Sequence, residues 1–204
     1  MSEKKILDKF IASGAVLKGH FKLSSGLHSD TYIQCSQIMQ DYKNSQELCR
    51  LLVDKVIKKI GDNKINLVIS PAMGGVLVGY EIARILGVKN IFCERVDGDF
   101  QLRRGFKIPK KANILIVEDV ITTGKSSLEV LDLVSLYDVN IVAEASLIDR
   151  SDDILDMEKK LSIPIVSLLR VEAETFSANN IPNNLKDIKA IKPGSRFISN
   201  SVKG

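Results

Sequence analysis

The strongest constraint on the fold of this chain is a repeated alternation of short apolar runs with amphipathic segments. Continuous apolar runs are typical of parallel strands that are buried on both faces, and the segments between them are typical of helices that cover those faces. The pattern therefore predicts an α/β fold with a five-stranded parallel sheet flanked by helices. We expect strands at 65–70, 90–93, 112–117, 140–147 and 165–169, and helices near 75–86, 126–137 and 152–160.

The N-terminal part of the chain follows a different pattern and predicts three further elements. A short amphipathic helix is expected to end at Gly14. Two loosely alternating stretches, 20–23 and 31–34, flank a turn of serine and glycine and predict a hairpin-like element. A long amphipathic helix is expected to follow, with Asn44 as its N-cap and Gly61 at its end.

Length and composition indicate one globular domain. The chain has 204 residues, of which 45% are hydrophobic and 26% charged, so it can bury a substantial core and is neither disordered nor fibrous. A net charge of +4 is too small to indicate a nucleic-acid-binding protein. We expect a single domain over 1–204, comprising an N-terminal region at 1–44, an α/β core at 45–170 and a polar surface tail at 171–204.

Cysteine and histidine usage predicts neither disulfides nor a protein-held metal. Cys35, Cys49 and Cys93 lie far apart and are expected to be buried thiols in a reducing compartment. His20 and His28 have no spacing that fits a zinc site. No window reaches the roughly 18 apolar residues of a membrane span. We therefore expect a cytoplasmic protein with no membrane or nucleic-acid partner and no metal-ligating side chains.

An acidic pair and a phosphate-type turn follow the expected strand at 112–117. Glu118 and Asp119 come first, and a turn rich in threonine and glycine leads into the next helix. Backbone N–H groups of such a turn, together with a helix N-terminus, bind phosphate. The two carboxylates would repel a phosphate. They could instead accept hydrogen bonds from ribose hydroxyls, and their negative charge would stabilise a cationic ribosyl transition state.

This motif is compatible with two alternatives. Gly124, Lys125 and Ser126 match the end of a Walker A loop, but Asp119 stands where that motif requires glycine. The acidic pair could also be a solvated strand end. The turn that follows the pair favours the ribose and phosphate interpretation.

Three other stretches are candidates for ligand contacts. The turn at 70–75 contains two glycines that would let a pyrophosphate approach the backbone. A long basic loop around 94–105 could close over a departing anion, or it could be a solvated stretch. Arg150 follows the strand at 140–147, where it could bind a carboxylate or pair with Asp149 or Asp152 on the surface.

Several of these stretches resemble one family, the orotate phosphoribosyltransferases, which are type I phosphoribosyltransferases. VEDVITTGKSS at 117–127 is similar to the signature that binds phosphoribosyl pyrophosphate (PRPP). HFKLSSGLHSDTYIQ, ISPAMGGV and ERVDGDFQLRRGF are similar to the N-terminal hood, the pyrophosphate loop and the mobile loop of that family. With Asp149-Arg150 and the closing KPGSR, the resemblance runs over nearly the whole chain.

The resemblance implies roles for individual residues. Catalytic roles fall on Asp119 and Glu118, and on Arg95, Arg103 and Arg104 of the basic loop. Orotate binding falls on Thr122, Arg150, Tyr32 and Ile33. PRPP binding falls on Glu118, Asp119, Val120, Ile121, Thr122, Thr123, Gly124, Lys125 and Ser126, together with Met73 and Gly74.

The resemblance also implies a reaction and an assembly. The fold would be that of the type I enzymes with a small hood at 1–44, and the reaction would convert PRPP and orotate to orotidine 5′-monophosphate and pyrophosphate with Mg²⁺. The protein would be a homodimer with shared active sites, in which the loop at 94–105 reaches the neighbouring subunit and lacks order until PRPP binds. A purine-type acceptor, or a non-catalytic PRPP-binding regulator, would keep the same signature.

The sequence departs from better-known bacterial members in the basic loop, which lacks their set of lysines and histidine. Ser24 and Gly74 stand where those members have lysines in the hood turn and the pyrophosphate loop. The resemblance therefore leaves open which loop residue is catalytic.

Overall fold

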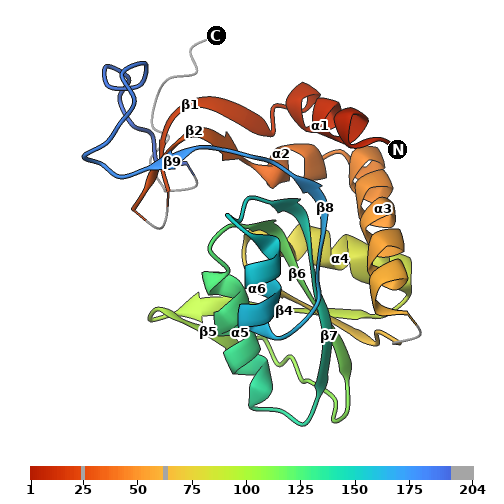
Figure 1. Ribbon diagram of the computed structural model, residues 1–204. Helices are drawn as coiled ribbons and strands as arrows, with labels where there is room; N and C mark the ends of the chain where they lie inside the picture. Colours follow the sequence, from red (N-terminus) through yellow and green to blue (C-terminus); the bar gives the residue numbers. More distant parts are fainter. Residues whose placement is uncertain (24–25, 62–63, 194–204) are drawn as a thin grey trace.

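A six-stranded sheet forms the centre of the computed structural model, which describes residues 1–23, 26–61 and 64–193 (Figure 1). Its strand order is β5-β4-β3-β6-β7-β8, and the strands β4, β3, β6, β7 and β8 are parallel, as predicted. The sixth, β5, was not predicted and runs antiparallel to β4 at the edge. The strands are β3 (Leu67–Pro71), β4 (Lys89–Val96), β5 (Asp99–Leu102), β6 (Asn113–Ile121), β7 (Asn140–Asp149) and β8 (Ile165–Arg170).

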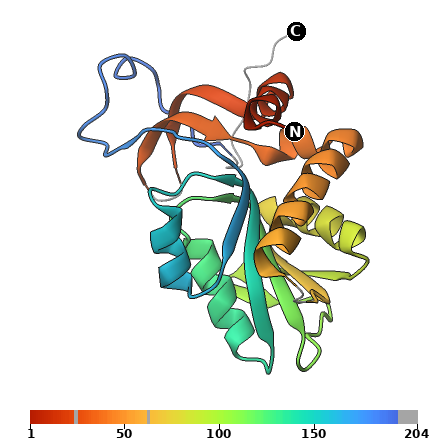
Figure 2. The same cartoon turned by 45° about the vertical axis from the view of Figure 1, so that its right-hand side comes forward.

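Helices cover both faces of this sheet, as Figure 2 shows from the side. One face packs on α3 (Tyr42–Ile60) and α4 (Gly74–Leu86), and the other packs on α5 (Lys125–Ser135) and α6 (Ile154–Leu161). The central strand β6 sends Leu115 and Val117 into the first core and Ile114 and Ile116 into the second. Burial on both faces explains why its sequence is apolar without alternation.

Helix α3 begins earlier than predicted. Asp41 is its N-cap, and the Asp41 carboxylate accepts hydrogen bonds from the backbone N–H groups of Lys43 at 2.8 Å and Asn44 at 3.3 Å. The predicted cap, Asn44, is therefore wrong, because a carboxylate three residues upstream satisfies the free amides first. The predicted end at Gly61 is confirmed by a φ of 65° at that residue.

A small second sheet forms the hood, which in Figure 1 lies over one end of the main sheet. The predicted hairpin is confirmed as β1 (Val16–Lys22) paired with β2 (His28–Ile33), preceded by α1 (Glu3–Ala12) and followed by α2 (Cys35–Met39). Ser24 lies outside the described residues. The third hood strand is β9 (Thr175–Phe176), which pairs with β2.

The segment after residue 170 is therefore not a plain surface tail. In addition to β9, Ile191 forms a bridge to Phe21 of β1, and Leu185 is buried. The polar composition of this segment predicts exposure. Its backbone groups nevertheless form hydrogen bonds with the hood strands, whose edges would otherwise be unpaired. Gly194, Ser195 and Arg196 of the closing motif lie outside the described residues.

The basic loop around 94–105 also differs from expectation, because β4 and β5 form a hairpin there. Glu94 accepts two hydrogen bonds of 2.7 Å from Arg104, and the guanidinium of Arg95 lies 4.2 Å from the centre of the Phe100 ring. Glu94 thus supplies a counter-charge to Arg104 across the hairpin. The lack of order expected in the absence of PRPP stays a prediction.

Two smaller expectations concern cysteines and membrane spans. Cys35, Cys49 and Cys93 are free thiols and all are buried, as predicted. Among the helices that the structure describes, none combines the length and the apolar character that a bilayer crossing requires.

Two glycines allow α4 to lie directly on the sheet. A Cβ atom at Gly75 would stand 2.7 Å from the backbone oxygen of Val117 in β6. A Cβ atom at Gly79 would stand 1.9 Å from Ser70 Oγ and 3.1 Å from Ser70 Cβ in β3. Both distances to oxygen are far below ordinary contact, so the absence of a side chain sets how closely α4 approaches β3 and β6.

We predict that Gly79→Ala destabilises the protein, although alanine is the better helix former by about 1 kcal/mol. The clash with Ser70 should outweigh that gain and lower the free energy of unfolding by about 1–3 kcal/mol in urea titration. In a Ser70→Gly background the same alanine should cost much less, because the Ser70 atoms are gone and Asn90 Oδ1, at 3.1 Å, is the close atom that remains. A stabilising Gly79→Ala in the native background would contradict this packing account.

Candidate active site

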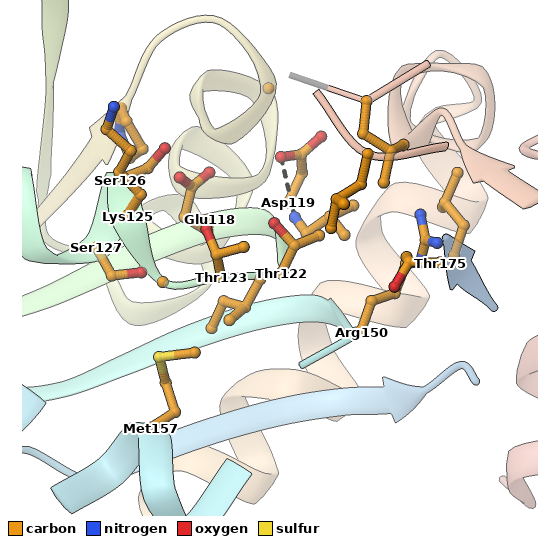
Figure 3. Close-up of a pocket in the computed structure, with 18 of the residues that line it drawn as sticks. Glu118, Asp119, Thr122, Thr123, Lys125, Ser126, Ser127, Arg150, Met157 and Thr175 are labelled. Carbon is orange, nitrogen blue, oxygen red and sulfur yellow. Dashed lines mark hydrogen bonds between the residues drawn. The ribbon is translucent and has the colours of Figure 1, made fainter. Parts of the chain in front are cut away.

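A large cavity of about 1070 Å³ lies at the carboxyl ends of the central strands, under the hood (Figure 3). Ligands of parallel α/β sheets bind in this position. The turn between β6 and α5, the end of β7, the start of α4, helix α6, the hood and the C-terminal segment all contribute to its walls. Of the residues predicted for the site, it is lined by Tyr32, Ile33, Gly74, Arg95, Glu118, Asp119, Val120, Ile121, Thr122, Thr123, Gly124, Lys125, Ser126 and Arg150.

The acidic pair stands at the end of β6, where the strand meets the cavity. Glu118 is buried, and burial raises the pKa of its carboxyl well above the ordinary value, with further increases from Asp119 and Glu144. Burial also raises the pKa of Asp119, opposed by the backbone N–H of Val120, which donates to Asp119 Oδ1 at 2.9 Å. Burial and mutual repulsion therefore destabilise the ionised forms of both carboxyls, and hydroxyl donors or a developing positive charge would relieve this cost.

The acidic pair also shows why glycine is required in the turn at 70–75. A Cβ atom at Gly74 would stand only 2.4 Å from Asp119 Oδ1. The first turn of α4 therefore lies against the Asp119 carboxylate, and any side chain at Gly74 would displace it.

The turn between β6 and α5 presents donors to the cavity. Thr122, Thr123 and Lys125 are exposed, and Gly124 has a φ of +68°. A Cβ atom on Gly124 would stand 2.2 Å from Met157 Sδ of α6, so both its backbone angle and its surroundings require glycine. Helix α5 starts directly after it, and the N–H groups of its first turn have no acceptor within the helix. Such a turn binds an anion.

Arg150 follows β7 and lies on the opposite side of Asp119 from the α5 turn in Figure 3. Its Nη2 donates to Ser29 Oγ at 3.1 Å, and its Nε is buried with no acceptor among the described residues. Burial lowers the pKa of the guanidinium, opposed by Asp30 and Tyr32. A buried donor without an acceptor favours an anionic ligand such as a carboxylate.

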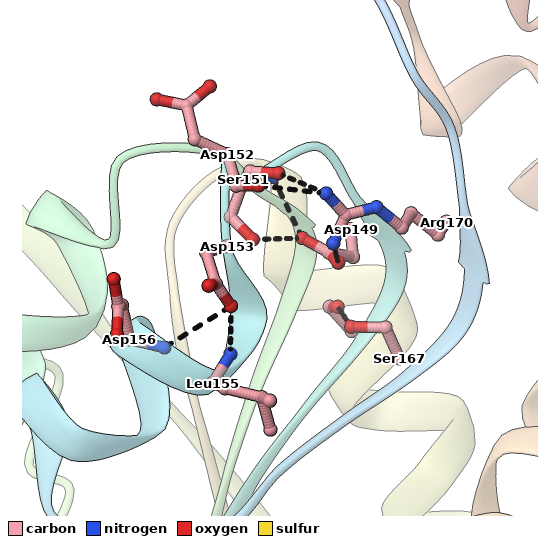
Figure 4. A network of polar contacts seen from close by, with 9 residues as sticks. Asp149, Ser151, Asp152, Asp153, Leu155, Asp156, Ser167 and Arg170 are labelled. Atoms are coloured by element: carbon pink, nitrogen blue, oxygen red, sulfur yellow. Dashed lines mark hydrogen bonds and ion pairs between the residues drawn. The ribbon is translucent and has the colours of Figure 1, made fainter.

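The alternative surface pairing of Arg150 is wrong, because another arginine occupies that place. Arg170 Nη1 lies 3.2 Å from Asp149 Oδ2, and Ser151 donates to Asp149 Oδ1 through its N–H at 2.8 Å and its hydroxyl at 2.6 Å (Figure 4). Arg170 Nη2 also donates to the carbonyl of Asp152 at 3.0 Å. This network fixes the end of β7 and leaves Arg150 directed to the cavity.

The basic loop is only partly brought into this cavity. Arg95 lines it while paired with Glu129. Arg103 and Arg104 do not line the cavity, and neither does Met73, which is 82% exposed.

Several lining residues were not predicted. The hood adds Lys22, Leu23 and Leu27, and these lie in the hairpin stretch that the resemblance had already marked. Six more lie in the other stretches that resemble the family, namely Pro71, Ala72, Phe100, Ser127, Lys192 and Pro193. No such stretch contains the rest, which reach the cavity only through tertiary packing. They are Asp152, Asp153, Asp156, Met157, Lys160 and Thr175.

Comparison with known proteins identifies the family. Residues 38–167 match the family model of the phosphoribosyl transferase domain. A protein of Sphingopyxis alaskensis named orotate phosphoribosyltransferase is 43% identical over 98% of this chain and 100% of its own length. One of Desulforamulus reducens with the same name is 41% identical, with the same coverage of both chains.

Solved structures agree on the fold. Orotate phosphoribosyltransferase from Aeropyrum pernix superimposes with a TM-score of 0.66 at 22% identity, covering 81% of this chain and 93% of its own. An adenine phosphoribosyltransferase superimposes with a TM-score of 0.65 at 20% identity, covering 82% and 100%. At these identities the structural likeness establishes the architecture, whereas the curated relatives align along their full length. The phosphoribosyl transferase domain and this alignment together show that the chain belongs to the orotate phosphoribosyltransferase family.

Proposed function

We propose that the chain transfers the phosphoribosyl group of PRPP to the ring nitrogen of orotate, releasing pyrophosphate and orotidine 5′-monophosphate. The observation that carries the proposal is one cavity that combines an anion-binding turn, an acidic pair and a buried arginine. These are complementary to the phosphate, the ribose and the carboxylate of the two substrates. The names of the curated relatives support the same reaction.

In this assignment the β6–α5 turn binds the 5-phosphate of PRPP. Thr122, Thr123 and Ser126 add hydroxyl donors to the backbone N–H groups, with Val120, Ile121, Gly124 and Lys125 in the same loop. Glu118 and Asp119 accept hydrogen bonds from the ribose hydroxyls. As the bond to pyrophosphate breaks, positive charge develops on the ribose ring. The acidic pair therefore stabilises this transition state more strongly than the ground state.

The pyrophosphate would lie beside the start of α4. Gly74 and Met73 form that turn, and Arg95 is the cation of the basic loop that already reaches the cavity. Its ion pair with Glu129 would have to open or rearrange to meet a phosphate. Arg95 is therefore assigned to the leaving group.

Orotate would bind under the hood. The Arg150 guanidinium pairs with its carboxylate, while Tyr32 and Ile33 pack against the ring and Thr122 donates to it. Burial raises the pKa of Tyr32, so its hydroxyl stays protonated and can donate a hydrogen bond at neutral pH.

Magnesium would be held mainly by the substrate. In the described ranges, no three or more His, Cys, Asp or Glu side chains are grouped in a way that could hold a metal ion. The acidic pair instead fits a Mg²⁺ that keeps water ligands and takes most of its oxygens from PRPP. When bound, the ion would neutralise part of the pyrophosphate charge.

Two alternatives lead to different expectations. A purine-type enzyme would keep the phosphate turn, and the adenine phosphoribosyltransferase neighbour shares the fold. Such an enzyme would not need a buried arginine for a carboxylate. A PRPP-binding regulator would bind PRPP without releasing pyrophosphate. The curated relatives favour orotate as the acceptor.

We also infer a cytoplasmic location. Cys35, Cys49 and Cys93 are all buried and free. Burial raises the pKa of Cys49 and of Cys93 to about 12, so both remain protonated thiols. Free thiols are typical of a reducing compartment.

Arg150→Ala should raise the KM for orotate by roughly tenfold or more, because a charge-assisted pair is lost, while the KM for PRPP changes little. Arg50→Ala, an exposed arginine of α3, serves as the matched control and should change neither constant. Steady-state kinetics with each substrate varied in turn provides the measurement. Equal increases in both KM values would indicate a structural role for Arg150 instead.

A homodimer with shared sites is the second part of the proposal. One face of α4 exposes apolar side chains next to the cavity, with Leu77 50% and Tyr80 63% exposed and Met73 at its start. A second copy of the chain would cover this face. Arg103 and Arg104 project from the β4–β5 hairpin without lining their own cavity, which supports a role in the neighbouring subunit.

Subunit mixing tests this arrangement. Asp119→Asn should lower turnover by about 10² or more, and an Arg103→Ala/Arg104→Ala double variant should also be inactive. When the two are mixed and exchange subunits, about one quarter of wild-type sites should recover, because one site in each mixed dimer receives both intact parts. No recovery after demonstrated exchange would mean that the hairpin serves its own subunit or is not catalytic.

A further inference from the structure

A carboxyl group that the proposed reaction does not use lies behind the phosphate turn. Glu144 is in the middle of β7 and is 0% exposed. Its Oε1 accepts a hydrogen bond of 2.6 Å from Ser127 Oγ, whereas its Oε2 has no partner among the described residues. Glu144 pairs in register with Ile116 of β6 and Ile165 of β8, so its neighbours on both adjacent strands are apolar.

This carboxyl group is costly for stability. An acid with one unsatisfied oxygen in an apolar interior is less favourable than an aliphatic side chain of similar size. Burial raises the pKa of Glu144 to about 7, opposed by the bond from Ser127. Packing alone therefore does not account for a glutamate at this position, and its one hydrogen bond is the feature to explain.

Ser127 connects this carboxyl group to the phosphate turn. It belongs to the first turn of α5, after Gly124, Lys125 and Ser126, and it also lines the cavity. The backbone N–H of Leu128 donates to the carbonyl of Gly124 at 2.9 Å and closes that turn. The N–H groups of residues 125–127 precede this bond and are the donors offered to a phosphate.

The same turn is confined from two sides. Met157 of α6 lies against Gly124, where even a Cβ atom would be 2.2 Å from its sulfur. On the sheet side, Glu144 fixes the Ser127 hydroxyl. Contacts on both sides restrict the first turn of α5, and residues 125–127 of this turn line the cavity.

We propose that Glu144 is a positioning residue for the phosphate turn, holding the first turn of α5 in place through Ser127 so that its N–H groups meet the 5-phosphate of PRPP. This proposal rests on the proposed function. Glu144 itself does not contact the substrate. It acts by fixing the donors before the ligand arrives, which limits the ordering cost of binding.

The test measures binding of ribose 5-phosphate, which carries this phosphate but no pyrophosphate, by isothermal titration calorimetry. Ser127→Ala and Glu144→Leu should each raise its Kd on the order of tenfold. Glu144→Gln keeps an oxygen acceptor and should restore most of the affinity. The Glu144→Leu/Ser127→Ala double variant should be no weaker than either single variant, because both remove the same contact.

Two controls separate positioning from general damage. The Kd of inorganic pyrophosphate, which would bind beside α4, should change less than twofold in every variant. Ser167→Ala removes a comparable 2.6 Å contact between hydroxyls of β7 and β8 without touching α5, and it should leave the ribose 5-phosphate Kd unchanged. Unfolding curves of each variant show that it is folded under the assay conditions.

The outcomes are distinct. An unchanged Kd in Ser127→Ala, or equal weakening of ribose 5-phosphate and pyrophosphate, overturns the positioning role, as does failure of the wild-type protein to bind ribose 5-phosphate. Additive effects in the double variant overturn it as well. Wild-type binding without pyrophosphate release from PRPP and orotate would instead refute the proposed function while the positioning test still stands.

Discussion

The site depends on the burial of β6 between two hydrophobic cores. Leu115 and Val117 pack toward α3 and α4, while Ile114 and Ile116 pack toward α5. Because β6 is held on both faces and paired with β3 and β7, its carboxyl end emerges at a fixed point of the sheet. The acidic pair lies in the last part of β6 and the phosphate turn follows it without a break, so the apolar packing of one strand sets the geometry of the chemistry.

The parallel core could be predicted because each of its elements carries its own signal. Apolar runs, helical periodicity and terminal glycines such as Gly61 are local, and they placed five strands and their helices close to the observed bounds. The elements that were missed depend on distant partners. β9 is two residues long and exists because β2 offers an open edge, and β5 is stabilised by contacts such as the Arg104–Glu94 pair. Neither has a sequence pattern of its own.

The residues of the site also fall into two groups, those that local sequence predicts and those that depend on tertiary contacts. The α5 turn could be predicted because its residues are consecutive and the chemistry of a phosphate turn is local. Ser29 and Met157 could not, because Ser29 matters through its bond to Arg150 and Met157 through its contact with Gly124. Glu144 lies inside a predicted strand, where a charged residue interrupts the apolar pattern and by itself indicates no role. Only the structure shows that Ser127 is its partner.

The central claim is that one cavity places a carboxylate-bearing pyrimidine on Arg150 opposite a phosphoribosyl group on the α5 turn. The most direct measurement is the rate of pyrophosphate release from PRPP with orotate, uracil or adenine as the acceptor. Uracil is the same ring without the carboxylate, so it would leave the Arg150 guanidinium buried without its anion. The account predicts release with orotate and a kcat/KM lower by on the order of 10² or more with uracil and with adenine. Equal rates with orotate and uracil, or a preference for adenine, would contradict it.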